Sequence, residues 1–179
     1  MSKIYSDGYI DRAYSDLKSY FLQASYVDDN TLIKAITFGG KEKTYQAWDG
    51  IDASQLIENR RQNPYTYENE IDNYQQDHYQ LHWNEKLNTN WSTNIGLNYT
   101  KGQGYFEQYK DERDAADYNN LIADGSDVIV RRWLDNKFYV ANFNATYTKN
   151  ALEVISGFSY SNYKNDHFGE VIWGNNLAT

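Results

Sequence analysis

The sequence predicts an all-β protein: an antiparallel up-and-down meander of about six strands that forms part of a transmembrane β-barrel. Three observations favour this fold class. Several stretches alternate apolar and polar residues with a period of two, which gives a strand one apolar and one polar face. Aromatic residues make up 17 % of the 179 residues, and the chain has one proline. Short turns alternate with long polar connections, as in outer-membrane barrels.

The first predicted hairpin covers residues 15–48. Apolar residues at every second position from Tyr20 to Tyr26 predict its first strand, and Asp28-Asp29-Asn30 predicts the turn before a return strand over residues 31–40. We expect the lysine of the return strand to lie near a rim of the apolar face, where its long side chain reaches water. A three-residue turn would place on the apolar face four residues of the return strand: Leu32, Lys34, Ile36 and Phe38.

The second predicted hairpin, residues 76–110, has the clearest pattern. Two alternating runs between His78 and Tyr99 flank Asn88-Thr89-Asn90. A three-residue turn keeps the apolar residues of both runs on one face, whereas a two-residue turn would set them against polar residues. We therefore predict a three-residue turn with Asn90 in its left-handed position. The expected partners are Leu87 with Trp91, Trp83 with Ile95, Leu81 with Leu97, and Tyr79 with Tyr99.

The opposite face of this hairpin carries histidine, glutamine, asparagine, serine and glycine. From Tyr79 to Leu87 the strand measures about 27 Å, and a tilt of about 40° reduces its height to roughly 20 Å, close to the apolar band of outer-membrane barrels. Tyr79 and Tyr99 would lie at one rim of that band and Trp91 at the other, where aromatic rings prefer to lie. These features predict lipid on one side and a water-filled interior on the other.

The third predicted hairpin, residues 133–173, repeats the pattern. Apolar residues alternate from Tyr139 to Tyr147 and, with the opposite parity, from Leu152 to Tyr160. An even-numbered turn around Lys149-Asn150 brings these residues to one face. The expected partners are Tyr147 with Leu152, Ala145 with Val154, Ala141 with Phe158, and Tyr139 with Tyr160.

Two long polar connections, residues 49–75 and 111–132, are predicted to be extracellular loops of the barrel. Long irregular loops usually serve a function in a compact fold. Aromatic residues near the loop ends are our candidate ligand-binding residues, because they would stack on a ligand at the barrel mouth. Packing within the loops and an interface girdle are their alternative role. The candidates are Trp48, Tyr65, Tyr67, Tyr105 and Tyr109.

Metal, cofactor and catalytic sites find no support in the sequence, so we predict no metal, no cofactor and no enzyme. His78 and His82 would lie about 13 Å apart on one strand face, too far to share a zinc ion. The acidic residues from Asp111 to Asp127 lack the spacing of a calcium-binding loop, which favours a solvated surface. Gly39-Gly40 and Gly102-Gln103-Gly104 lie in strand patterns, which indicates bulges or bends of a curved sheet.

Charge and hydropathy exclude further classes. The net charge of −8 argues against a nucleic-acid partner, because phosphate binding requires basic residues. No apolar run approaches the roughly 18 residues of a transmembrane helix. The chain has no cysteine, which excludes disulfides and thiolate sites.

Four segments carry a resemblance that covers most of the chain: SDGYIDRAYSDLKSYFLQ (Ser6–Gln23), FGGKEKTYQAWDG (Phe38–Gly50), NEIDNYQQDHYQLHW (Asn69–Trp83) and YTKGQGYFEQYK (Tyr99–Lys110). They resemble the barrel of TonB-dependent outer-membrane receptors of the Bacteroidetes type. The resemblance implies a piece of a barrel of about 22 strands that encloses a plug domain.

The same resemblance implies location in the outer membrane of a Gram-negative cell and active uptake of a scarce nutrient. The implied ligand is an iron chelate, haem, cobalamin or a glycan. The implied partners are outer-membrane lipid, the plug domain of the same receptor, TonB acting through that plug, and the small-molecule or glycan ligand.

The chain also departs from this family. It shows no signal peptide, TonB box or plug domain, and about six strands cannot close such a barrel, so we expect an internal segment of a longer receptor. A passive porin-like channel is one alternative. A soluble all-β ligand-binding module is another, and it would bury its apolar faces against a second sheet. We expect the isolated chain to aggregate, because strand edges and an apolar face are left uncovered.

Overall fold

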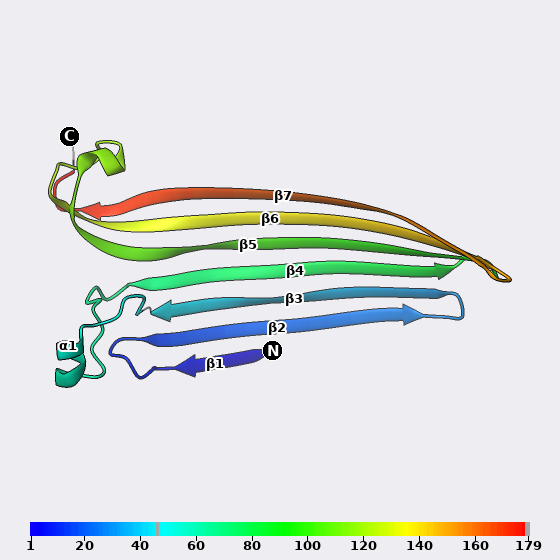
Figure 1. The fold of residues 1–179 in the computed structure, drawn as a ribbon, viewed down its shortest axis with the longest axis horizontal. Coiled ribbons are helices and arrows are strands. Elements are labelled where there is room, and N and C mark those ends of the chain that lie inside the picture. The colour runs from blue at the N-terminus through cyan, green and yellow to red at the C-terminus, as the bar shows by residue number, and fades with distance from the viewer. Residues whose placement is uncertain (46, 178–179) are drawn as a thin grey trace.

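A computed structural model describes residues 1–45 and 47–177. In these residues, seven antiparallel strands form one open sheet in sequence order, with β1 and β7 at its edges (Figure 1). The predicted all-β, up-and-down meander is therefore confirmed. The strands are β1 (Ser2–Ser6), β2 (Tyr14–Val27), β3 (Thr31–Tyr45), β4 (Ile71–Lys86), β5 (Trp91–Arg113), β6 (Ser126–Lys149) and β7 (Leu152–Gly174).

Strand β1 is the one that the alternating pattern did not predict. It pairs with the loop-side half of β2, from Ser2 opposite Ser19 to Ser6 opposite Ser15. All five of its residues are exposed. A strand with no buried face needs no period-two pattern, so alternation gives no signal for it.

The hairpin of β4 and β5 has the predicted register. Trp83 lies opposite Ile95, and the neighbouring predicted pairs of leucine and tyrosine follow in the same register. The predicted left-handed conformation of Asn90 is wrong, since Asn90 is not among the described residues with positive φ. The Asn88 side chain holds the turn instead: its Oδ1 accepts hydrogen bonds from the backbone N–H groups of Asn90 and Trp91, at 2.9 and 3.0 Å.

The hairpin of β2 and β3 is shifted by one residue from the predicted register. Asp28 Oδ1 accepts the backbone N–H groups of both Asn30 and Thr31, which extends the turn, and Val27 pairs with Leu32. A shift of one residue exchanges the two faces of the return strand. The prediction that Leu32, Lys34, Ile36 and Phe38 share the apolar face was therefore wrong. That face carries Ile33, Ala35 and Thr37, while Lys34 lies opposite His82 on the polar face.

The hairpin of β6 and β7 has the predicted parity but not the predicted partners. Its turn contains only Asn150 and Ala151, because Lys149 already pairs with Leu152. Asn150 adopts φ 54°, the left-handed conformation that a tight hairpin turn requires. Each predicted partner is consequently displaced by two residues. The observed pairs are Tyr147 with Val154, Ala145 with Ser156, Ala141 with Tyr160, and Tyr139 with Asn162.

The strands extend further into the predicted loops than expected. Strand β5 continues to Arg113 and β6 starts at Ser126, so residues 114–125 connect them rather than 111–132. A 3₁₀ helix, η1 (Ala115–Tyr118), lies in that connection, and α1 (Ala53–Glu58) lies in the connection from β3 to β4. None of the helices in the described part of the chain is long and apolar enough to cross a membrane.

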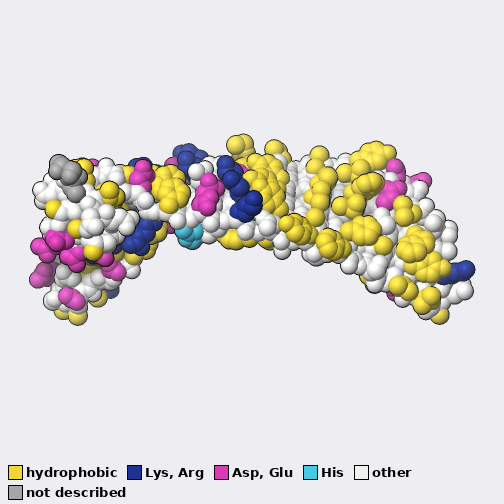
Figure 2. Space-filling view, turned by 90° about the horizontal axis from the view of Figure 1, so that it is seen from above, with side chains coloured by type: hydrophobic (Ala, Val, Ile, Leu, Met, Phe, Trp, Pro, Cys, Tyr) yellow, Lys and Arg dark blue, Asp and Glu magenta, His cyan; other side chains and the backbone are white. Residues whose placement is uncertain are grey.

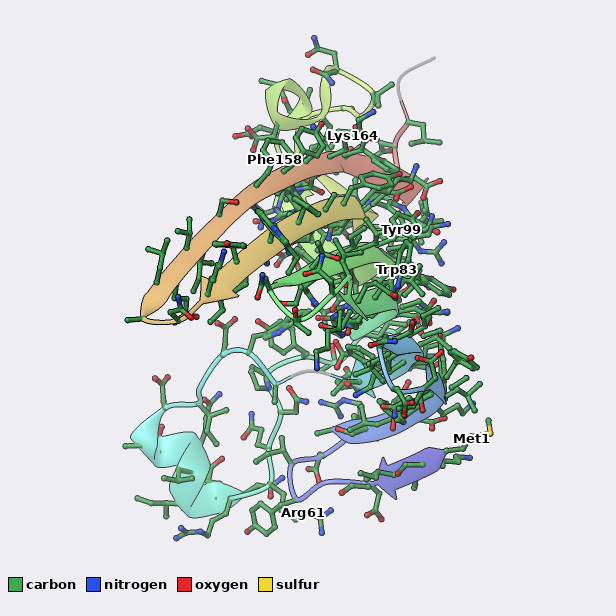
Figure 3. All side chains as sticks on the ribbon, turned by 90° about the vertical axis from the view of Figure 1, so that its right-hand side faces the viewer. Met1, Arg61, Trp83, Tyr99, Phe158 and Lys164 are labelled. Carbon is green, nitrogen blue, oxygen red and sulfur yellow. The ribbon has the colours of Figure 1, made fainter. Side chains whose placement is uncertain are left out.

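The sheet is curved, and its two faces differ in chemistry. Viewed from the turn end, it forms an arc, and the labelled side chains of Trp83, Tyr99, Phe158 and Lys164 lie on its outer, convex side (Figure 3). Because side chains alternate along a strand, every residue in register with these four belongs to the convex face. Hydrophobic side chains gather over the half of the molecule nearest the turns, and acidic side chains over the long-loop end (Figure 2).

Of the two predicted roles of the strand glycines, bulges or bends of a curved sheet, the continuous pairing excludes bulges at Gly39, Gly102 and Gly104. Pairing of β4 with β5 is continuous through Gly102 and Gly104, and pairing of β3 with β4 is continuous through Gly39. Tyrosine side chains cross the glycine positions instead. The Tyr20 hydroxyl passes Gly39 to donate to Asp77 Oδ1 at 2.8 Å, and Tyr74 passes Gly102 so that its hydroxyl accepts from Asn136 Nδ2 at 3.3 Å.

Candidate functional site

Three adjacent rows of side chains on the convex face form what we call the apolar band. Each row crosses β2 to β7, and its members lie directly opposite one another on neighbouring strands. The rows are Tyr26–Ile33–Trp83–Ile95–Phe143–Phe158, Ala24–Ala35–Leu81–Leu97–Ala141–Tyr160 and Leu22–Thr37–Tyr79–Tyr99–Tyr139–Asn162.

No described residue covers the apolar band. Trp83 is 45 % exposed, Leu97 44 %, Phe143 42 % and Phe158 65 %. An apolar surface that extends over six strands is larger than the patches that water-soluble monomers expose. The band therefore requires an apolar neighbour.

Aromatic rings border the apolar band at both ends. On the long-loop side, Tyr99 stacks between Tyr79 and Tyr139, with ring centroids 6.0 and 4.9 Å away. On the turn side, Trp91 contacts Tyr147 at 5.0 Å. From Trp91 to Tyr99 the strand spans about 26 Å at roughly 3.3 Å per residue. Once the strand is tilted by about 40°, the aromatic rims enclose a height of roughly 20 Å, close to the apolar band of outer-membrane barrels.

A shallow groove of about 750 Å³ runs along the middle of the band. The small side chains of Ala24, Ala35 and Ala141 line its floor, and Leu81 and Leu97 line its sides. The row of the band that contains Tyr79, Tyr99 and Tyr139, called the tyrosine row below, also lines the groove. Its walls are almost entirely apolar, so it suits a hydrocarbon chain rather than a polar ligand.

The concave face is polar and hydrogen-bonded across strands. Asn94 donates to Asn84 at 2.6 Å, and Ser159 donates to Asn142 at 2.7 Å. His78 Nδ1 and Thr100 Oγ1 lie 2.9 Å apart, and the His78 ring stacks on the ring of Phe38. His78 and His82 share this face, as the alternation predicted.

The five aromatic residues predicted to bind a ligand all lie at the long-loop end, in two contact groups. Trp48 touches Tyr65 at 5.8 Å between ring centroids, and Tyr65 in turn donates a hydrogen bond to Asp49. Tyr67 lies 6.3 Å from Tyr109. Arg131 links Tyr105 to the second group, because the Arg131 guanidinium carbon lies 4.5 Å from the centroid of the Tyr105 ring.

A buried carboxylate, Glu107, joins the second group to the sheet. It accepts hydrogen bonds from Tyr67 and Asn69, both at 2.6 Å, and from Arg131 Nε at 2.7 Å. Its side chain is 1 % exposed, and it lies far beyond the apolar band along β5. Burial acts to raise the pKa of Glu107, but the three donors outweigh it and hold the pKa below its usual value.

Burial and neighbouring carboxylates at the loop end keep the phenols of Tyr67 and Tyr65 neutral. Burial, together with the hydrogen bond to Glu107, raises the pKa of Tyr67. Burial and the hydrogen bond to Asp49 raise the pKa of Tyr65 to about 12. Both tyrosines therefore remain protonated donors at neutral pH. Tyr67 fixes the connection to the sheet through Glu107, and Tyr65 binds Asp49 within the connection.

Acidic residues in and beside the connection from β5 to β6 accept hydrogen bonds from nearby backbone N–H groups. Asp127 Oδ1 accepts the Glu112 N–H at 3.0 Å, and Asp124 Oδ1 accepts the Ala115 N–H at 2.7 Å. No group of three or more histidine, cysteine or acidic side chains in the described residues is placed to hold a metal ion. The connection also has a small core of its own, in which Ile122 packs on Val128 and Val130.

Sequence reasoning missed the Glu107–Arg131 pair and a row of lysines beyond the tyrosine row. A signal for the lysines was present: Lys101 follows Tyr99 by two residues, and Lys137 precedes Tyr139 by two, so both share the parity of the apolar band. Nothing in the local sequence marks Glu107 as buried, since its partners come from two other segments.

The arrangement offers an exposed apolar surface on the convex face and a hydrogen-bonded loop end. The chain matches no known protein family, no curated protein and no solved structure.

Proposed function

We propose that this chain is a wall segment of a transmembrane β-barrel, with the apolar band against lipid and the concave face toward a water-filled interior. The observation that carries the proposal is the side on which the apolar residues lie. When a curved sheet closes, its concave side becomes the interior. A soluble barrel needs an apolar interior, whereas an apolar exterior with a polar interior suits a bilayer.

The aromatic rims support the same proposal. Tyrosine and tryptophan prefer the interface between hydrocarbon and water, because one end of each ring system is apolar and the other donates a hydrogen bond. The stacked Tyr79, Tyr99 and Tyr139 would lie at one interface and Trp91 at the other.

We further propose that the wall belongs to a TonB-dependent outer-membrane receptor, in which it encloses a plug and presents loops to a nutrient. The four segments described above support this role by resemblance. The two long connections and their aromatic residues, Trp48 and Tyr65 among them, would contribute to ligand capture. Uptake in such a receptor depends on energy from TonB.

Fluorescence quenching tests the membrane contact. A variant that keeps Trp83 alone, with the other tryptophans changed to phenylalanine, is inserted into phosphatidylcholine vesicles that contain brominated acyl chains. We expect strong quenching of Trp83. The matched variant keeps Trp133 alone, which lies ten strand positions from Phe143 toward the loops, and it should be quenched weakly. A soluble module would instead give a monodisperse, folded sample in plain buffer with Trp83 unquenched, and that result would remove the proposal.

Transport is tested in the cell that makes the protein. If the wall serves a receptor, deletion of the gene should abolish high-affinity uptake of one scarce nutrient. Collapse of the proton gradient should abolish the same uptake in the wild type. Uptake that persists after the gradient is collapsed would identify a passive channel instead.

A further inference from the structure

Three lysines form a line across β5, β6 and β7 immediately beyond the tyrosine row. Lys101 lies opposite Lys137, and Lys137 opposite Lys164. Each is two residues along its strand from the tyrosine row, so all three share the convex face. The label of Lys164 lies on the convex side in Figure 3, together with Tyr99 and Phe158. Figure 2 shows basic side chains at the border where the hydrophobic half ends.

The charges of this lysine row are not compensated. Like charges directly opposite each other on neighbouring strands repel and destabilise the sheet. None of the three ammonium groups has an ion pair or hydrogen bond within the described residues. Lys101 and Lys164 are exposed and Lys137 is half-buried. An external anion would relieve this repulsion, although the chain itself carries a net charge of −8.

Within the described residues, the acidic side chains near the row form no ion pair with its lysines. Asp77 is in line with Lys101, but it accepts hydrogen bonds from Tyr20 and Gln75, both at 2.8 Å. Asp135 and Asp166 lie opposite each other on β6 and β7, two residues nearer the loops than Lys137 and Lys164, and no ion pair joins them to these lysines. Toward the apolar band, the next row contains no charged residue. The three ammonium groups therefore border a row without charge on the side of the band, and Asp77 is the one carboxylate in line with them.

We propose that Lys101, Lys137 and Lys164 bind the phosphate of a membrane lipid headgroup, with an acyl chain of that lipid in the groove of the apolar band. The inference rests on the proposed membrane location of the chain. Two independent features support it: the uncompensated cations next to the tyrosine rim, and the apolar groove of about 750 Å³ that begins at that rim. Phosphate attracts ammonium groups strongly where the membrane surface limits screening by water.

The test measures lipid preference with Trp83 as the reporter. The Trp83-only chain is placed in phosphatidylcholine vesicles, and a brominated phosphatidylglycerol or a brominated phosphatidylcholine is added as the guest lipid. The ratio of quenching by the two guests gives the preference for the anionic lipid. We expect a clear preference, which should fall by up to about fivefold for each lysine changed to glutamine, since one basic residue near a membrane contributes about 1 kcal/mol. The test variants are Lys101→Gln, Lys137→Gln and Lys164→Gln, singly and combined.

The matched control removes the same charge elsewhere, by combining Lys34→Gln, Lys86→Gln and Lys149→Gln. Lys34 lies on the concave face, and Lys86 and Lys149 lie at the turn end. We expect the control to keep the preference. An equal loss in both triple variants would overturn the proposal, because general charge would then explain it. Displacement of the anionic lipid by inorganic phosphate at comparable concentration would also overturn it, since the row would then be a site for soluble phosphate.

The two proposals fail in different ways. If the lysine row does not bind lipid phosphate, Trp83 is still quenched by brominated phosphatidylcholine while the guest preference is absent. If the chain does not contact lipid at all, Trp83 is not quenched by either guest.

Discussion

Glu107 on β5 and Arg131 on β6 lie opposite each other and form an ion pair of 2.7 Å in which the carboxylate is 1 % exposed and the guanidinium side chain 30 %. The pair ties the connection between β3 and β4 to the sheet, because Tyr67 and Asn69 of that connection donate to the same carboxylate.

Replacement of Glu107 should therefore release this connection. Glu107→Ala leaves Arg131, Tyr67 and Asn69 without their acceptor. We expect a loss of about 2–3 kcal/mol in local stability, less than for a fully buried pair because Arg131 is partly exposed. Hydrogen exchange of the backbone amides from Tyr67 to Ile71 should accelerate by about 30- to 150-fold. Glu112→Ala, an exposed carboxylate on the same strand, should leave exchange unchanged.

Acid should release the same connection. The folded-state pKa of Glu107 is lowered, so its contribution to stability is present above the pKa of an unfolded glutamate and is lost as pH falls through the folded value. We expect amide exchange in this segment to rise at acidic pH, after correction for intrinsic rates. Burial raises the pKa of nearby Glu70, which acts in the opposite direction, so Glu70→Gln should sharpen the effect. A pH profile unaltered by Glu107→Gln would contradict this assignment.

Adjacent residues on β5 should respond differently to the same charged substitution. Leu97 lies in the middle row of the apolar band and Asn98 on the concave face. Leu97→Arg should cost about 2–4 kcal/mol for insertion into phosphatidylcholine vesicles, because the charge enters hydrocarbon. Asn98→Arg should cost less than about 1 kcal/mol. Urea-dependent insertion, followed by tryptophan fluorescence, measures both, and equal costs would argue against lipid on the convex face.

Two glycines of β5 should differ in their tolerance of alanine. A Cβ on Gly104 would lie 2.6 Å from the backbone Cα of Tyr74, which cannot move without disturbing the pairing. A Cβ on Gly102 would meet only the far end of the Tyr74 side chain, with Cζ at 2.9 Å, and this side chain can move aside by rotation about its Cα–Cβ bond. We expect Gly104→Ala to destabilise the protein by about 1–3 kcal/mol and Gly102→Ala by clearly less. Thermal unfolding in detergent compares the two.

Alternation predicted which residues share a face, but turn chemistry decided the register. For β4 and β5 the two agree, and Trp83 faces Ile95 as predicted. Parity fixes a register only to within two residues, which is why the partners of Tyr147 and Ala141 were displaced although their face was correct. In the first hairpin, hydrogen bonds to Asp28 lengthened the turn by one residue and reversed the face of Lys34.

The loop end was predictable in composition but not in contacts. Trp48, Tyr65, Tyr67, Tyr105 and Tyr109 were identified by type and position, and the structure places all five at that end. Their partners could not be predicted, because Glu107, Arg131 and Asn69 come from separate segments that only the folded sheet brings together. Burial of a charged residue depends on such long-range contacts rather than on its neighbours in the sequence.

The number of strands has a directional consequence. In an up-and-down meander each strand reverses the direction of the one before it, so with seven strands in the described residues β1 and β7 point the same way (Figure 1). Joining these two edges would create a parallel pair, which would break the uniform antiparallel hydrogen bonding of the sheet. A strand that pairs with β7 in an antiparallel manner must run opposite to β7. Because β1 runs in the same direction as β7, β1 cannot be that strand.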